Sequence, residues 1–129
     1  MTNSYIIDSY GWIEYLDGTV KGTKVRDIVE NRNNKIYTCT ISIAEIVSKF
    51  IRKGLEPVLA LRAITSASVV IDVDTDLSTI AGETHARIKS RIKDFGLADA
   101  YVLTCSIKYD AKVVTGDPHF KSIKGVVFI

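Results

Sequence analysis

The stretch KVVTGDPHF, residues 112–120, joins a short β-branched run to a Gly-Asp-Pro turn. Runs of this kind are typical of buried strands, and the turn residues indicate where the strand ends. Asp117 therefore follows the carboxyl end of a predicted strand. This strand, with an acid at its carboxyl end, is the element around which the rest of the fold is predicted.

Outward from it, short β-branched runs alternate with longer stretches of helical periodicity. Strands are predicted at residues 4–7, 36–40, 69–73, 112–115 and 126–128. Helices are predicted at residues 10–16, 23–31, 43–53, 57–65, 77–93 and 98–109. Strands that alternate with helices predict an α/β fold, in which helices cover both faces of a parallel sheet.

The composition is that of an ordinary globular protein, with 129 residues, 47% hydrophobic and 25% charged. We expect one domain, residues 1–129, with one core. The net charge of +2 is too small to indicate a nucleic-acid partner by an overall basic field. No apolar run approaches the ~18 residues of a membrane span, and the first strand leaves no room for a signal peptide. With Cys39 and Cys105 in apolar patterns, a cytoplasmic protein with reduced thiols is expected.

Four acids are expected to meet at one edge of the sheet. Asp8 follows the first predicted strand, and Asp117 follows the fourth. Glu45 and Asp99 lie in the first turns of helices that should begin at the same edge. Ligands of open α/β sheets bind at this edge, beyond the carboxyl ends of the strands.

Carboxylates that share a cleft repel one another unless a cation compensates them. Ligand sets made of oxygen atoms favour Mg²⁺ or Mn²⁺ over zinc. The four acids therefore predict a divalent metal centre, which would suit the hydrolysis of a phosphate ester.

Each acid also has a purely structural interpretation. Asp8 can cap the following helix, Asp99 can interact with a helix dipole, and Asp117 can begin a turn. Ser42 and Glu45 match the Ser-x-x-Glu capping box. Only the joint placement of the four acids at one edge favours a functional site over these interpretations.

Four short blocks resemble, in order and spacing, the signature blocks of PIN domains: IIDS at 6–9, SIAE at 42–45, LADA at 97–100 and VTGDPHF at 114–120. The resemblance covers nearly the whole chain. The small size of the chain resembles that of the VapC toxins of toxin–antitoxin pairs. It implies a three-layer α/β/α sandwich with a central five-stranded parallel sheet.

The same resemblance implies an endoribonuclease that hydrolyses RNA phosphodiester bonds with Mg²⁺ or Mn²⁺. The implied catalytic residues and metal ligands are Asp8, Glu45, Asp99 and Asp117. Ser9 and Thr115 would support them through hydroxyl hydrogen bonds, although both also suit a turn or a strand. Implied partners are an RNA substrate, a cognate antitoxin and a second copy of the chain. The alternatives are a non-catalytic PIN-type RNA-binding or adaptor protein and a phosphotransfer domain that uses Asp8.

Lys49 and Arg52 follow Glu45 at helical spacing, so we expect them on its flank, where they would bind RNA phosphates. The alternative is a solvated Glu45–Lys49 ion pair. His119 is expected to pack beside Phe120 rather than to act in the site, and His85 is expected at the surface or its boundary.

Two further groups have competing interpretations. The segment 72–76, Asp-Val-Asp-Thr-Asp, is a rival acidic site, but Asp76 or Thr75 is expected to cap the next helix, which leaves Asp74 as a minor candidate. The aromatic side chains at positions 10, 12 and 15 are expected to pack in the core or a dimer rather than to stack on bases.

Overall fold

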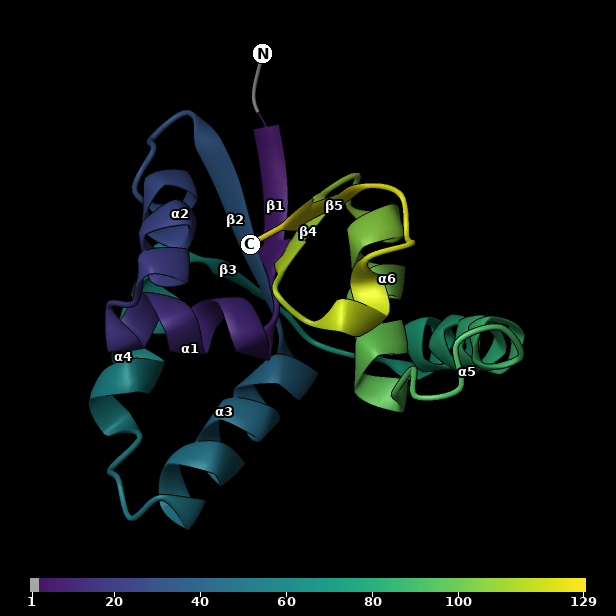
Figure 1. Ribbon diagram of the computed structural model, residues 1–129, viewed down its shortest axis with the longest axis horizontal. Coiled ribbons are helices and arrows are strands. Elements are labelled where there is room, and N and C mark those ends of the chain that lie inside the picture. Colours follow the sequence, from purple (N-terminus) through teal and green to yellow (C-terminus); the bar gives the residue numbers. More distant parts are fainter. Residues whose placement is uncertain (1–2) are drawn as a thin grey trace.

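The computed structural model describes residues 3–129, and five parallel strands form its central sheet (Figure 1). The strand order is β3-β2-β1-β4-β5, and every neighbouring pair is parallel. The strands are β1 Asn3–Ile7, β2 Asn34–Cys39, β3 Val69–Ile71, β4 Lys112–Thr115 and β5 Val126–Phe128. This order places the first and fourth predicted strands side by side at the centre of the sheet.

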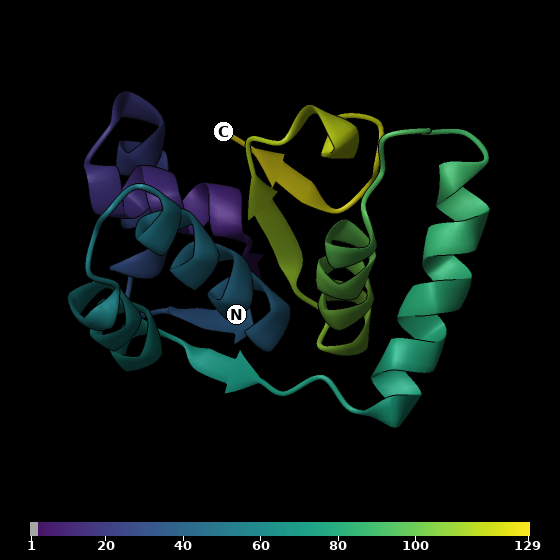
Figure 2. The same cartoon turned by 90° about the horizontal axis from the view of Figure 1, so that it is seen from below.

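Six α-helices cover the sheet: α1 Ser9–Asp17, α2 Val20–Val29, α3 Thr40–Arg52, α4 Val58–Ala67, α5 Thr75–Lys89 and α6 Leu97–Lys108. A short 3-10 helix, η1 Pro118–Phe120, follows β4. Figure 2 shows α6 between the sheet and α5, with the first four helices on the other side. The predicted α/β/α sandwich with a five-stranded parallel sheet is therefore confirmed.

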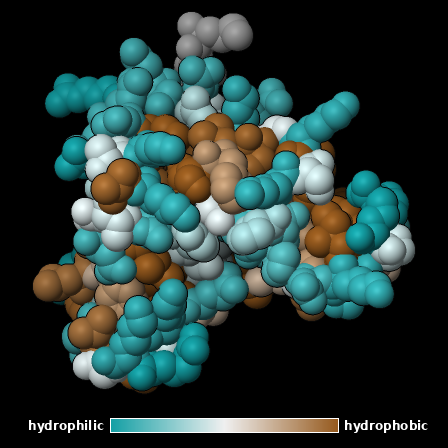
Figure 3. All heavy atoms as spheres, in the orientation of Figure 1, coloured by the Kyte–Doolittle hydropathy of each residue, from teal (hydrophilic) through white to brown (hydrophobic). Residues whose placement is uncertain are grey.

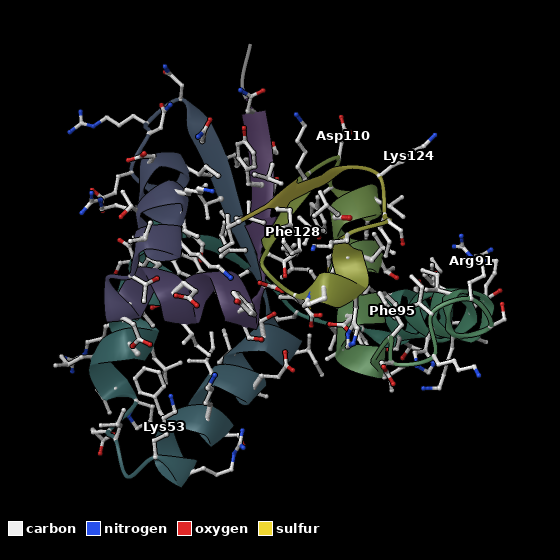
Figure 4. The ribbon with its side chains drawn as sticks, viewed as in Figure 1. Lys53, Arg91, Phe95, Asp110, Lys124 and Phe128 are labelled. Carbon is white, nitrogen blue, oxygen red and sulfur yellow. The ribbon has the colours of Figure 1, made fainter. Side chains whose placement is uncertain are left out.

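The core has two halves because successive side chains of a strand point to opposite faces. Ile6 belongs to the half under α5 and α6, where Phe95 lies beside the start of α6 (Figure 4). Ile7 belongs to the half under α1 to α4, with Trp12 and Ile46. All of these side chains are buried. The alternation fixes β1 between two apolar layers and delivers Asp8 to the edge of the sheet.

Several predicted boundaries differ from those of the structure. Helix α3 begins at Thr40 rather than at residue 43, so it takes over the end of the predicted second strand. Helix α5 ends at Lys89 rather than at residue 93. Its N-cap is Asp74, whose Oδ1 accepts the N–H of Leu77 at 2.8 Å, so the prediction of Asp76 or Thr75 as cap is wrong.

Two of the places where apolar side chains remain exposed hold a group of them. One group lies at the end of α3 and the start of α4: Ile51, Leu55, Val58 and Leu59. The other, Ile80 and Ile107, borders a groove of about 420 Å³ between α5 and α6, and Figure 3 shows apolar surface there. Over residues 3–129, no helix is both long and apolar enough to cross a membrane.

Candidate active site

A pocket of about 200 Å³ lies at the carboxyl edge of the sheet. Side chains from the β1–α1 junction, α1, α3, α6 and the segment after β4 line it, and all four predicted acids are among them. The lining residues are Asp8, Ser9, Tyr10, Ile13, Glu45, Lys49, Arg52, Asp99, Val102 and Asp117. The parallel-sheet rule thus placed the acids at one pocket, although they are far apart in the sequence. None of the acids of the 72–76 segment lines this pocket. Asp76 lines the separate α5–α6 groove instead.

Asp8 is the most buried of the four acids, with 6% of its surface exposed. It caps α1, because its Oδ1 accepts the N–H of Gly11 at 2.8 Å. Burial raises the pKa of Asp8 to about 7; hydrogen bonds with Thr115 and Gly11 lower this pKa, whereas the charges of Asp117 and Asp99 raise it. The structural and functional interpretations of Asp8 therefore coexist, since one oxygen caps the helix while the carboxyl group borders the pocket.

Glu45 is held by a residue of another helix. The hydroxyl of Ser9 donates to Glu45 Oε1 at 3.1 Å. The predicted capping box with Ser42 does not form, because α3 begins at Thr40, two residues before Ser42. Ser42 therefore lies inside the helix, with no hydrogen-bond partner for its buried hydroxyl. Burial raises the pKa of Glu45, and the charges of Asp99 and Asp117 add to this effect.

Asp99 and Asp117 are both fixed by backbone N–H groups. Asp99 Oδ2 accepts the N–H of Gly96 at 2.9 Å at the start of α6. Asp117 Oδ1 accepts the N–H of His119 at 2.9 Å, and the N–H of Asp117 donates to Thr115 Oγ1 at 3.0 Å. Burial and the charge of Asp117 raise the pKa of Asp99. Both carboxylates are therefore positioned before any ligand arrives.

His119 differs from its prediction. Phe120 packs against Phe95, with ring centroids 5.7 Å apart, but His119 turns towards the acids instead. Its Nδ1 lies 3.1 Å from Asp117 Oδ1 and 3.4 Å from Asp99 Oδ2. These three side chains each place one possible ligand atom within 4.8 Å of the other two. The available signal was the spacing, since a residue two positions after an acid can fold back onto it across a tight turn.

Lys49 and Arg52 line the pocket from α3, as predicted from their spacing to Glu45. The alternative of a Glu45–Lys49 ion pair is not found, because within residues 3–129 the only contacts closer than 4.0 Å between a basic nitrogen and a carboxylate oxygen are those of His119 with Asp99 and Asp117. Arg52 Nε donates to Ser48 O and Oγ, both at 3.3 Å. The pocket is thus lined by four acids and by two cationic side chains from α3.

The aromatic residues of α1 have different roles. Trp12 is fully buried and donates to Thr38 Oγ1 at 3.0 Å, and the Tyr15 ring packs against its edge, in line with the packing interpretation. Tyr10 instead lines the pocket and accepts a hydrogen bond of 2.9 Å from Lys21 Nζ. The Tyr10 ring lies so close to Gly116 that a Cβ there would be 2.8 Å from Tyr10 Cζ.

Taken together, these features define an α/β protein with an acid-lined pocket at the carboxyl edge of a five-stranded parallel sheet. The PIN domain model matches residues 5–126, and the chain belongs to this family. The resemblance seen in the four signature blocks is therefore confirmed. No curated protein sequence matches the chain significantly.

Solved structures of toxin–antitoxin proteins share the fold. The chain is similar to VapC20 of Mycobacterium tuberculosis, described as a sarcin–ricin loop cleaving toxin, with TM-score 0.77, 17% identity and coverage of 95% of this chain and 96% of that one. It is also similar to a chain of the DNA-bound VapBC2 of Rickettsia felis, with TM-score 0.71, 20% identity and coverage of 98% and 97%. DNA-bound VapBC of Salmonella typhimurium gives TM-score 0.70, 19% identity and coverage of 100% and 98%. At these identities the likeness concerns the fold.

Proposed function

We propose that the chain is an endoribonuclease that hydrolyses RNA phosphodiester bonds with Mg²⁺ or Mn²⁺, and that it is the toxin of a toxin–antitoxin pair. One observation carries the proposal: four carboxylates from separate parts of the chain line a single pocket whose wall bears Lys49 and Arg52. Family membership and the cleaving activity named for VapC20 support it.

The chemistry of the donor set fits a divalent cation. Burial and mutual repulsion raise the pKa of Asp8, Glu45 and Asp99. These carboxylates are costly to ionise in the metal-free protein, because their negative charges are buried close together. A bound cation would compensate those charges and favour the ionised carboxylates as its ligands. His119 Nδ1 is a buried polar atom without a hydrogen-bond partner beside two of these acids, and an ion is one explanation for such an atom.

In the proposed mechanism, Asp8, Glu45, Asp99 and Asp117 hold the cation. When bound, the cation neutralises their charge, orients the scissile phosphate and activates water. Glu45, steadied by Ser9, would accept the proton of the attacking water as general base. Lys49 and Arg52 bind the RNA phosphates next to the cleaved bond.

The alternatives fit less well. A phosphotransfer domain needs an accessible carboxylate to accept the phosphoryl group. Asp8 is buried, and its Oδ1 accepts the N–H of Gly11. A non-catalytic adaptor has no need for four convergent acids, of which Asp8, Glu45 and Asp99 have a pKa raised by burial and by neighbouring carboxylates.

Digestion of structured RNA by the purified chain tests the proposal. We expect cleavage with Mg²⁺ or Mn²⁺, none with EDTA, and recovery when the metal is restored. A matched pair of variants then locates the activity: Glu45→Gln is expected to abolish cleavage, whereas Glu83→Gln, at an exposed position of α5, is expected to retain it. Binding of RNA without cleavage under every metal condition would favour the adaptor and overturn the nuclease.

We also propose an antitoxin partner and a homodimer. Support comes from the solved VapBC structures with the same fold and from the exposed apolar residues at the α3–α4 junction and beside the α5–α6 groove. Contiguous exposed apolar surface is typical of protein interfaces. Light scattering on the chain alone is expected to give twice the 14.3 kDa chain mass, and a monomer at micromolar concentration would contradict the dimer.

A further inference from the structure

The Nδ1 atom of His119 is buried, faces two carboxylate oxygens and makes no hydrogen bond. In the neutral ring, one nitrogen carries a proton and the other presents a lone pair. A lone pair that faces Asp117 Oδ1 at 3.1 Å and Asp99 Oδ2 at 3.4 Å is repelled by both oxygens. The arrangement is favourable when a positive charge lies between the three atoms, either a proton on Nδ1 or a metal ion bound by all three.

The spacing of these atoms suits a metal ion. Two ligands at right angles around an octahedral ion with bonds of about 2.1 Å are about 3.0 Å apart. The two contacts of His119 Nδ1, at 3.1 and 3.4 Å, approach this separation, and all three ligand atoms lie within 4.8 Å of one another. The backbone holds the set in place, because Asp117 Oδ1 also accepts the N–H of His119 itself.

We infer that His119 is a metal ligand through Nδ1, and that the centre is therefore a mixed nitrogen–oxygen site that prefers Mn²⁺ to Mg²⁺. The inference rests on the proposed metal centre and goes beyond it by naming a ligand and a selectivity. Mg²⁺ is bound in proteins mainly through carboxylates, phosphates and water. An imidazole ligand instead favours first-row transition metals, in an order of affinity that begins at Mn²⁺. A nitrogen donor would therefore strengthen binding of Mn²⁺ more than binding of Mg²⁺.

Pulsed electron paramagnetic resonance of bound Mn²⁺ tests the ligand directly, because a coordinated imidazole couples its ¹⁴N nucleus to the metal spin. The protein is used without a histidine tag, with one equivalent of Mn²⁺. The chain has two histidines, so His85→Ala is the matched control for His119→Ala. His85 lies on α5, with its Nε2 3.1 Å from Phe95 O, and is not among the residues that line the pocket.

We expect ¹⁴N modulation in the wild type and in His85→Ala, and its loss in His119→Ala. Calorimetric titration gives the selectivity: His119→Ala is expected to weaken Mn²⁺ binding at least about tenfold, as removal of groups that support a metal site commonly does, and to change Mg²⁺ binding much less. His119→Gln, which keeps a side chain of similar size, is expected to behave like His119→Ala, and circular dichroism confirms that each variant is folded.

The outcomes separate this inference from the proposed function. The wild type could cleave RNA with metal while its bound Mn²⁺ shows no ¹⁴N coupling, or shows the same coupling in all variants. Either result overturns the role of His119 and leaves the nuclease proposal intact. Equal losses of Mn²⁺ and Mg²⁺ affinity in His119→Ala overturn the selectivity. A wild type that binds neither ion overturns both the inference and the metal centre on which it rests.

Discussion

The hydroxyl of Ser9 donates a 3.1 Å hydrogen bond to Oε1 of Glu45, which joins the first residue of α1 to the second turn of α3. The bond holds the glutamate at the pocket wall and lowers its pKa against the effect of burial. A supporting hydroxyl of this kind steadies a catalytic group without itself reacting.

Ser9→Ala is therefore expected to lower kcat/KM for RNA cleavage by roughly tenfold, which corresponds to about 1.4 kcal/mol. The melting temperature should change little, because the bond lies at an exposed site. Thr79→Ala, which removes a hydroxyl bonded to Thr75 O on the surface of α5, is the control. Equal rates for Ser9→Ala and Thr79→Ala would show that Ser9 does not support the site.

The raised pKa of Asp8 predicts an unusual dependence of stability on pH in the metal-free chain. Its pKa rises from 3.8 to about 7 on folding, so the folded state binds the proton more tightly. The resulting stabilisation is fully present below about pH 4 and is lost as the pH rises through 7. Asp8→Asn is neutral at every pH and keeps an oxygen for the N–H of Gly11.

With EDTA present, Asp8→Asn should thus be more stable than the wild type at pH 8, by an amount on the order of a few kcal/mol. The difference should shrink steadily towards pH 4. Urea denaturation from pH 4 to 8 measures it, with Asp72→Asn, at an exposed position, as the control. A difference that does not change with pH would mean that folding does not raise the pKa of Asp8.

The contact between Gly116 and the Tyr10 ring predicts a specific steric effect. Gly116→Ala would place Cβ 2.8 Å from Tyr10 Cζ, so either the ring or the loop that carries Asp117 must move. We expect a loss of about 1–3 kcal/mol in the free energy of unfolding. The loss should be much smaller in the Tyr10→Ala background, where the space is free.

Gly82→Ala is the matched control, because nothing lies within 4 Å of a Cβ at that helical position. It should stabilise the chain by roughly 0.5–1 kcal/mol. Urea denaturation of the four Gly116 and Tyr10 combinations gives the coupling energy. A coupling near zero would mean that the ring does not constrain Gly116.

The acids were predictable from the sequence because their positions follow from topology alone. Strands of a parallel sheet share one carboxyl edge, so Asp8 and Asp117 were expected at the same edge once their strands were recognised, and the pairing of β1 with β4 brings them together. Glu45 and Asp99 followed, since their helices begin at the same edge. None of these placements needed knowledge of side-chain packing.

The features that were missed depend on exact boundaries and rotamers. Ser42 fails as a cap because α3 starts at Thr40, a shift of a few residues that propensities do not resolve. His119 was assigned to packing because the sequence does not show that η1 turns its ring back towards Asp117. The contact of Tyr10 with Gly116 likewise joins segments whose approach only the folded chain reveals.

The cationic wall of the pocket predicts how RNA binds. Lys49→Glu should weaken RNA binding and reduce the dependence of affinity on salt, because fewer phosphate contacts release fewer counterions. Arg91→Glu makes the same charge change at an exposed position beyond α5, away from the pocket (Figure 4), and should have little effect. Titrations of labelled RNA with EDTA, at several salt concentrations, measure both slopes. Equal weakening by the two variants would indicate a general charge effect.

The most direct test of the acidic centre is the initial rate of RNA cleavage by Asp117→Asn relative to the wild type, both folded and at saturating Mn²⁺. The asparagine keeps an oxygen for the N–H of His119 but removes the charge that faces Asp99 and Asp8. If the four carboxylates form a metal-dependent nuclease centre, the rate should fall by roughly 100-fold or more. A folded Asp117→Asn protein that cleaves RNA at the wild-type rate would contradict the account.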